Sequence, residues 1–88
     1  MASYRVYLKR NAEKELRRLP FAYLSAIVDK IKRLANQPRP AGVQMLKGEE
    51  RYFRLRVSDY RIVYEVNDAD REIMVLRIGH RRDVYEGF

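Results

Sequence analysis

Apolar residues recur with helical spacing in one long stretch of the chain, between residues 22 and 35. Five apolar side chains there fall on one face of a 3.6-residue period: Leu24, Ile27, Val28, Ile31 and Leu34. Charged side chains fill the opposite face. This pattern predicts an amphipathic helix, which the prolines at positions 38 and 40 terminate.

A shorter helix is predicted upstream of it. Asn11 is a favourable N-cap residue, and Glu13 and Glu15 then fall in the first turn, where the helix dipole stabilises acids. The helix continues through Leu19 to Pro20, which ends it or begins the next one.

The other elements are predicted to be strands. Four runs rich in β-branched and aromatic residues indicate them: residues 4–8, 52–57, 60–66 and 72–78. The Ser58-Asp59 pair and residues 67–70 are turn signals. The last run is almost continuously apolar, which is typical of a central strand covered on both faces. We therefore expect a single α+β domain over residues 1–88, ordered β-α-α-β-β-β, with two N-terminal helices packed on a mainly antiparallel sheet.

Composition excludes several classes of protein. The 88 residues include no cysteine, which excludes a disulfide scaffold, a zinc–thiolate site and a cysteine nucleophile. One histidine and four isolated glycines indicate neither a metal site nor a phosphate-binding glycine loop, and we expect no cofactor. The chain has no long apolar run, so we expect no membrane span, no signal peptide and a cytoplasmic location. The adjacent Glu49 and Glu50 indicate a solvated loop rather than an acid–base pair.

Charge is the unusual feature of this sequence. Lysine and arginine number 19 against 12 acids, a formal net charge of +7, and most of the cations are arginines. Such a balance indicates a polyanionic partner, with nucleic acid the first candidate and a merely soluble basic surface the alternative. The excess lies in the first half of the chain, so the arginines of the second half, set among acids, need a separate explanation.

Those later arginines belong to the predicted strands. Arg54 and Arg56 share one strand face, and Arg61 follows a two-residue turn, within cross-strand reach of that pair. Beyond the last strand the chain adds Arg81, Arg82 and Tyr85. Several arginines and a tyrosine converging on an exposed sheet surface would hold a phosphate well. The alternative is cross-strand salt bridges, to Glu65, Asp59 and Glu72.

Two segments carry a family resemblance: YFRLRVSDYRIVY at residues 52–64 and IGHRRDVY at residues 78–85. Together they resemble the RelE/ParE superfamily of bacterial toxins, and its RelE branch most closely, with similarity over essentially the whole chain. RelE-like proteins are the toxins of type II toxin–antitoxin pairs. The resemblance implies a ribosome-dependent, metal-independent endoribonuclease (an mRNA interferase) that cleaves messenger RNA in the ribosomal A site and so inhibits translation.

The resemblance also implies catalytic residues. It assigns this role to Arg54, Arg56, Arg61, Arg81 and Tyr85. Two neighbours are further candidates: Arg82, because either it or Arg81 faces the site, and His80, which either takes part in proton transfer or simply closes the last strand. The implied reaction is attack of a ribose 2′-OH on the adjacent phosphodiester, leaving a 2′,3′-cyclic phosphate and a 5′-OH. Some relatives carry lysine where this chain has Arg54 and Arg56, so the general base is left unidentified.

The implied partners are the ribosome, its messenger RNA and an acidic antitoxin, with operator DNA reached only through the antitoxin and no membrane contact. The helix cations would then dock on ribosomal RNA: Lys14, Arg17, Arg18, Lys30, Lys32 and Arg33. Solubility is the alternative role for these six. Two other functions stay open, namely ParE-like inhibition of DNA gyrase, a branch that lacks a full arginine/tyrosine site, and RNA binding or cleavage without the ribosome.

Overall fold

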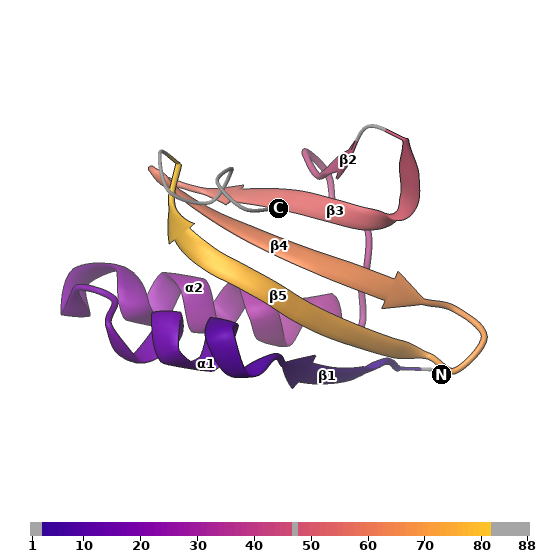
Figure 1. Ribbon diagram of the computed structural model, residues 1–88, viewed down its shortest axis with the longest axis horizontal. Helices are drawn as coiled ribbons and strands as arrows, with labels where there is room; N and C mark the ends of the chain where they lie inside the picture. The colour runs from indigo at the N-terminus through magenta and orange to yellow at the C-terminus, as the bar shows by residue number, and fades with distance from the viewer. Residues whose placement is uncertain (1–2, 47, 82–88) are drawn as a thin grey trace.

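A computed structural model describes residues 3–46 and 48–81 of the chain. In this part, five strands form one sheet and both helices lie along one side of it (Figure 1). The elements are β1 (Arg5–Leu8), α1 (Arg10–Arg17), α2 (Phe21–Leu34), β2 (Gln44–Leu46), β3 (Glu49–Val57), β4 (Tyr60–Asn67) and β5 (Glu72–His80). The predicted α+β class is confirmed, and β2 is the one element that was not predicted.

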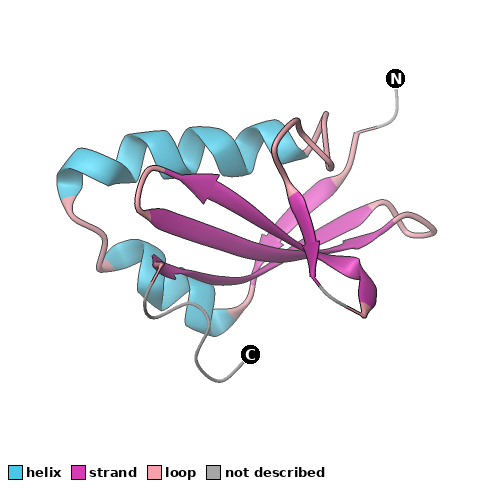
Figure 2. Cartoon of the chain, turned by 90° about the horizontal axis from the view of Figure 1, so that it is seen from above, coloured by secondary structure: helices cyan, strands magenta, loops and turns pink. Residues whose placement is uncertain are grey.

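The sheet has the strand order β1-β5-β4-β3-β2. Strand β1 pairs in parallel with β5, and every other neighbouring pair is antiparallel. Strand β1 therefore lies at one edge of the sheet and β2 at the other. The two helices connect these edge strands in the chain (Figure 2). Neither helix in the described residues is long and apolar enough to cross a membrane.

The core lies between α2 and the sheet. Ile27, Ile31 and Leu34 of α2 are buried, as the 3.6-residue period predicts. They meet the buried strand side chains Phe53, Leu55, Ile62, Tyr64, Val66, Ile73, Val75 and Ile78. Each such side chain contributes roughly 1.5–3 kcal/mol on leaving water, which is what holds the helix layer on this small sheet.

Helix α1 begins earlier than predicted. Lys9 occupies the N-cap position without a side-chain bond, and Asn11 lies inside the first turn, so the prediction of an Asn11 cap is wrong. Glu13 does lie in the first turn, and its carboxylate accepts a hydrogen bond from Arg17 at 2.6 Å. The negative charge at this end still offsets the exposed helix N–H groups.

Glu15 ties α1 to the sheet at a bulge in the β4–β5 ladder. The register between these strands shifts between Val63 and Tyr64. The Glu15 carboxylate accepts a hydrogen bond from the backbone N–H of Ile78 at 2.9 Å and contacts the Arg77 guanidinium at 3.2–3.3 Å. The bulge thus gives α1 a polar anchor on β5 in addition to apolar packing.

One strand was missed, and two strand predictions need correction. Strand β2 has only three residues, with Met45 mostly exposed, so no period of apolar residues marks it. Glu49 and Glu50, expected in a loop, begin β3. In β5, buried residues alternate with half-buried ones such as Met74, so the strand is central but not covered on both faces by the residues that the structure describes.

Candidate functional site

Three arginines lie on the side of the β3–β4 hairpin that faces away from the helices. Arg56 and Arg61 are direct cross-strand partners, and Arg54 lies two residues from Arg56 on the same face. Leu55 and Val57, which alternate with them, are buried on the helix side. We call Arg54, Arg56 and Arg61 the hairpin arginines; the alternation predicted from the sequence brings them together.

The turn between the two strands holds Arg61 in place. Ser58 has a φ of 56°, in the left-handed region that favours glycine. The Arg61 guanidinium folds back on this turn, and its Nη1 donates to the carbonyl oxygens of Ser58 at 3.1 Å and Tyr60 at 3.0 Å. With only 7% of its surface exposed, Arg61 is buried, which corrects the expectation of an exposed basic face. Its remaining donors keep a fixed position.

Arg54 is positioned by the strand that the sequence did not reveal. Gln44 of β2 is its cross-strand partner, and the Gln44 side-chain oxygen accepts a hydrogen bond from Arg54 Nη2. Arg56, by contrast, is exposed. The three guanidinium groups therefore differ in restraint: one is fixed by its own turn, one is bonded to a neighbouring strand, and one is open to solvent.

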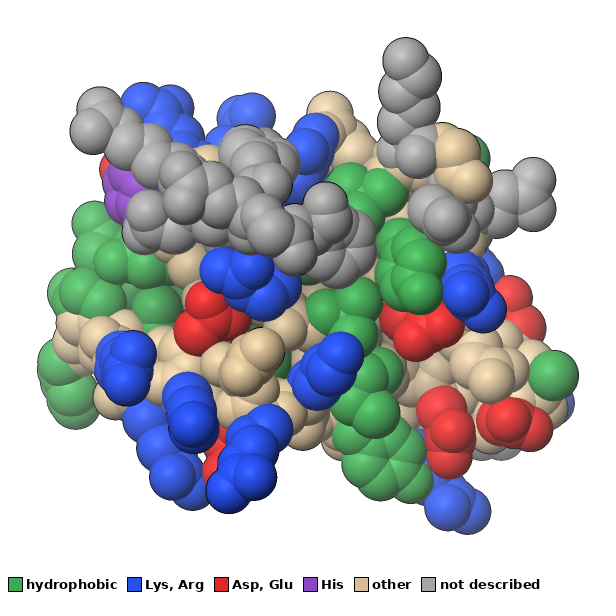
Figure 3. Space-filling model, viewed as in Figure 1, with side chains coloured by type: hydrophobic (Ala, Val, Ile, Leu, Met, Phe, Trp, Pro, Cys, Tyr) green, Lys and Arg blue, Asp and Glu red, His purple; other side chains and the backbone are tan. Residues whose placement is uncertain are grey.

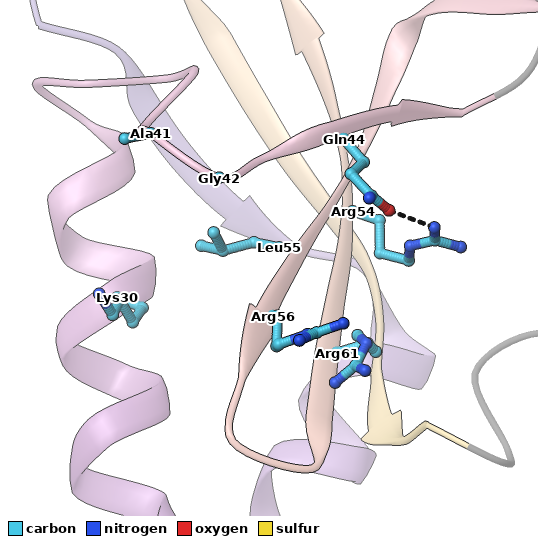
Figure 4. A pocket seen from close by; sticks show the side chains of 8 residues that line it. All are labelled: Lys30, Ala41, Gly42, Gln44, Arg54, Leu55, Arg56 and Arg61. Carbon is cyan, nitrogen blue, oxygen red and sulfur yellow. Dashed lines mark hydrogen bonds between the residues drawn. The ribbon is translucent and has the colours of Figure 1, made fainter.

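The hairpin arginines line an open pocket of about 470 Å³ (Figure 4). Lys30 of α2 and the Ala41–Gly42 segment complete its wall, together with Gln44 and Leu55. Gly42 has a φ of 86°, which a side chain would strain, so this turn in the wall depends on glycine. Among the described residues, four cations and no carboxylate line the pocket, which therefore suits an anion.

The salt-bridge alternative does not describe Arg56 or Arg61 within the part of the chain that the structure describes. Glu65, one of the proposed acidic partners, pairs instead with Arg51 at 3.4 Å. Within residues 3–46 and 48–81, neither Arg56 nor Arg61 forms an ion pair. Their positive charge is thus left for a ligand rather than being neutralised by the fold.

The other sequence candidates are distributed differently. The backbone N–H of Arg81 donates to the Asp59 carbonyl at 2.9 Å, which places Arg81 beside the turn that holds Arg61, though outside the pocket lining. His80 is the register partner of Tyr60 and meets its ring edge-on, with centroids 5.8 Å apart. It therefore belongs to the helix side of the sheet, opposite the hairpin arginines. Arg82 and Tyr85 lie outside the described residues.

Strong carboxylate interactions occur away from this pocket. Asp68 accepts a hydrogen bond from the Tyr4 hydroxyl at 2.5 Å and two from Arg39, at 2.7 and 3.2 Å. The bonds from Arg39 and then Tyr4 lower the pKa of Asp68 below its ordinary value. Burial raises the pKa of Tyr64, whose hydroxyl donates to the Pro38 carbonyl at 2.7 Å. These groups join segments of the fold and do not line the pocket.

The six helix cations are all exposed. Figure 3 shows lysine and arginine side chains gathered over the helix layer, at the lower left. Two of the six are paired within their own helix, Arg17 with Glu13 at 2.6 Å and Arg33 with Asp29 at 3.0 Å. A third, Lys30, lines the arginine pocket, which the sequence did not predict.

Comparison with known proteins shows what the chain as a whole is similar to. The family described as "ParE toxin of type II toxin-antitoxin system, parDE" matches residues 6–85. Toxin RelG of Mycobacterium tuberculosis is 29% identical over 83 residues, which cover 93% of this chain and 95% of that toxin.

Two solved structures share the fold. The first is the archaeal RelE–RelB complex of Pyrococcus horikoshii, with a TM-score of 0.81, 30% identity and coverage of 92% of this chain and 98% of that one. The toxin–antitoxin complex RelBE2 of M. tuberculosis has a TM-score of 0.79 and 28% identity, covering 91% of this chain and all of that one.

Proposed function

Because the chain belongs to the RelE/ParE superfamily of type II toxin–antitoxin toxins, we propose that it is an endoribonuclease that cleaves messenger RNA in the ribosomal A site. One observation carries the proposal: the three hairpin arginines line a single open pocket, and neither Arg56 nor Arg61 forms an ion pair with any residue that the structure describes. RelE-named toxins among its relatives support the same choice.

In the proposed reaction, the 2′-oxygen of a ribose attacks the adjacent phosphorus. The P–O5′ bond breaks, a 2′,3′-cyclic phosphate forms, and the proton lost from the 2′-hydroxyl ends on the 5′-oxygen. Negative charge builds on the phosphorane between these events. Arg61, held by its own turn, offers donors that need no rearrangement, which is the condition for strong electrostatic stabilisation.

The other arginines bind and orient the phosphate. Arg54, bonded to Gln44, and the exposed Arg56 approach from the neighbouring strand. Aligning the 2′-oxygen with the bond that breaks is itself worth a large share of the barrier. Arginine is a poor proton carrier, so we assign proton transfer to Tyr85, the one residue other than arginine in the catalytic set that the resemblance implies. The position of His80, on the helix side of the sheet, does not favour it for this role.

The helix cations would dock the toxin on ribosomal RNA. Arg17 and Arg33 each form an ion pair with an acid on the same helix. Three other exposed cations, Lys14, Arg18 and Lys32, form no ion pair within the described residues. Phosphate contacts of this kind supply affinity and speed association without reading sequence.

We further propose that an acidic antitoxin binds this toxin in the cytoplasm and that operator DNA is contacted only through it. The solved relatives are toxin–antitoxin complexes, and the formal charge of +7 favours an acidic partner. Covering the hairpin arginines would switch the enzyme off directly.

The test is to incubate the purified toxin with translating ribosomes and to map the 5′ ends of the messenger RNA. We expect cleavage within A-site codons, and each downstream fragment should carry a 5′-hydroxyl. The same messenger RNA without ribosomes is the control, and it should remain intact. A toxin that leaves the message intact on translating ribosomes would contradict the proposal, and cleavage of the free message would replace it with a ribosome-independent nuclease.

The matching family description favours one second candidate, inhibition of DNA gyrase in the manner of ParE toxins. A gyrase supercoiling assay separates the two functions, because a gyrase poison blocks supercoiling and accumulates cleaved plasmid, whereas the ribonuclease leaves both unchanged.

A further inference from the structure

Lys30 occupies an unusual position among the helix cations. It belongs to α2, yet its side chain lines the pocket of the hairpin arginines (Figure 4). Lys30 also lines a smaller adjoining hollow of about 80 Å³, which reaches Arg33 and shares Ala41 and Leu55 with the pocket. The two hollows thus meet at Lys30.

The geometry of β2 explains why α2 can reach this pocket. Strand β2 pairs with β3 as far as Arg54, its partner being Gln44, and the register of described pairs goes no further toward the turn. The edge of β3 next to Arg56 is therefore left without a paired strand among the described residues. Across this open edge, Leu55 points toward α2 and Arg56 points away from it (Figure 4).

The charge of Lys30 is also uncommitted. Arg33, one turn further along α2, forms an ion pair with Asp29 at 3.0 Å. Lys30 forms none with any residue in the ranges 3–46 and 48–81. Its exposed ammonium therefore adds a point charge at the helix end of a pocket whose other end holds three guanidinium groups.

We propose that Lys30 binds a second phosphate of the RNA strand, next to the one held by the hairpin arginines, as the strand crosses the open edge of β3. This inference rests on the proposed function and assigns Lys30 to the substrate rather than to ribosomal RNA. A single-stranded RNA has one phosphate per nucleotide, so a pocket with cations at both ends matches two or more consecutive phosphates better than one. Lys30 is then a substrate-binding residue of the cleavage site.

The test measures binding, so that it does not depend on cleavage. The probes are two 2′-O-methyl RNAs with a base-attached fluorophore, a dinucleotide with one phosphodiester and a tetranucleotide with three. Lys30→Met keeps the aliphatic stem and removes the charge. We expect it to weaken tetranucleotide binding about three- to tenfold at low salt and to lower the salt slope by about 0.7, with the dinucleotide unaffected.

Lys9→Met is the matched control, because Lys9 is an exposed lysine at the N-cap of α1 that lines neither hollow and has no assigned role in docking. It should leave binding of both probes unchanged. Equal losses for the two variants, an equal loss on both probes, or no binding of the wild type to the tetranucleotide would each overturn the inference. So would a Lys30→Met variant that weakened binding to a ribosomal RNA hairpin but not to the tetranucleotide.

Cleavage on ribosomes, measured in parallel, keeps the two proposals apart. If the wild type cleaves and Lys30→Met behaves like Lys9→Met, the inference about Lys30 fails while the endonuclease stands. If the wild type binds the tetranucleotide through Lys30 but does not cleave on ribosomes, the proposed function fails instead.

Discussion

The cations of the β3–β4 hairpin and those of the two helices are held in different ways. On the helices, Arg17 and Arg33 pair with acids one turn away. On the hairpin, Arg61 donates to two backbone carbonyls and Arg54 to the Gln44 side-chain amide. These acceptors are uncharged, so these bonds do not neutralise the guanidinium groups. The comparison teaches that the net charge of a segment does not locate a charged site: the second half of the chain has no net positive charge, yet three of its arginines line one pocket.

Exposure follows the same division. The helix cations extend into solvent, where screening by salt weakens each contact. Arg61 is 7% exposed, and a charge in such surroundings acts on a bound phosphate with less screening. We therefore expect the helices to control binding and the hairpin to control the chemical step.

The largest expected effect on cleavage comes from the substitution Arg61→Ala. Loss of one fixed charge donor should lower single-turnover cleavage at saturating ribosome by about 10²–10³. Because Arg61 is buried and bonds two carbonyls, we also expect a loss of about 1–3 kcal/mol in the free energy of unfolding, measured by urea titration.

Arg33→Ala is the control for that experiment, since it removes an exposed, paired arginine from α2. It should leave the cleavage rate at saturation within about twofold of the wild type, as expected for a surface position. Equal losses of cleavage in the two variants would show that any arginine serves, and the hairpin site would be wrong.

A second change addresses the helices. Replacing Lys14, Arg18 and Lys32 together by glutamine should weaken ribosome binding about 10- to 30-fold at low salt. It should also lower the slope of log K against log salt by roughly 2–3, because fewer counterions are released. Cleavage at saturating ribosome should survive. An unchanged slope would leave these cations only a role in solubility.

A third change sharpens the comparison within the hairpin. Gln44→Ala removes the bond that positions Arg54, and we expect kcat/KM to fall about fivefold, the equivalent of a hydrogen bond worth roughly 1 kcal/mol. Gln37→Ala, at the adjoining hollow, is the control and should have no effect. No loss in Gln44→Ala would mean that Arg54 is positioned by other contacts.

The smallest expected effect is on stability at low pH, where cations bonded to carboxylates lose their partners and Arg61, bonded to backbone carbonyls, does not. The pKa of Asp68 is lowered from 3.8 by Arg39 and Tyr4. Its contribution to stability is therefore present above about pH 4 and is lost as the pH falls through the lower native value. Urea midpoints of wild type and Asp68→Asn should differ at neutral pH and converge below that range. A constant difference would argue against this pair as the cause.

Much of the fold could be predicted because it follows from local periods. The helical period of α2 can be recognised from the spacing of apolar residues within that segment alone. The alternation that puts Arg54 and Arg56 on one strand face is equally local. A two-residue turn then fixes Arg61 opposite Arg56. These elements were predicted with nearly correct bounds, and with them the centre of the candidate site.

The misses share a different cause. Strand β2 is three residues long, so pairing with β3, rather than any pattern of its own, makes it a strand. The Asn11 cap fails because the contacts of α1 with β5, including the Glu15 anchor, decide where the helix lies, and propensity is a weak prior against them.

The sequence by itself determined which residues share a face, because strand and helix periods are properties of the backbone and need no partner. It determined the hairpin arginines in this way. Only the tertiary structure decided that Arg61 is buried against its own turn, that Gln44 bonds Arg54, and that Lys30 reaches the same pocket from α2. The contacts of Gln44 and Lys30 depend on where β2 and α2 lie against β3. The free energy of that arrangement comes from the whole core, so no short segment of the sequence shows it.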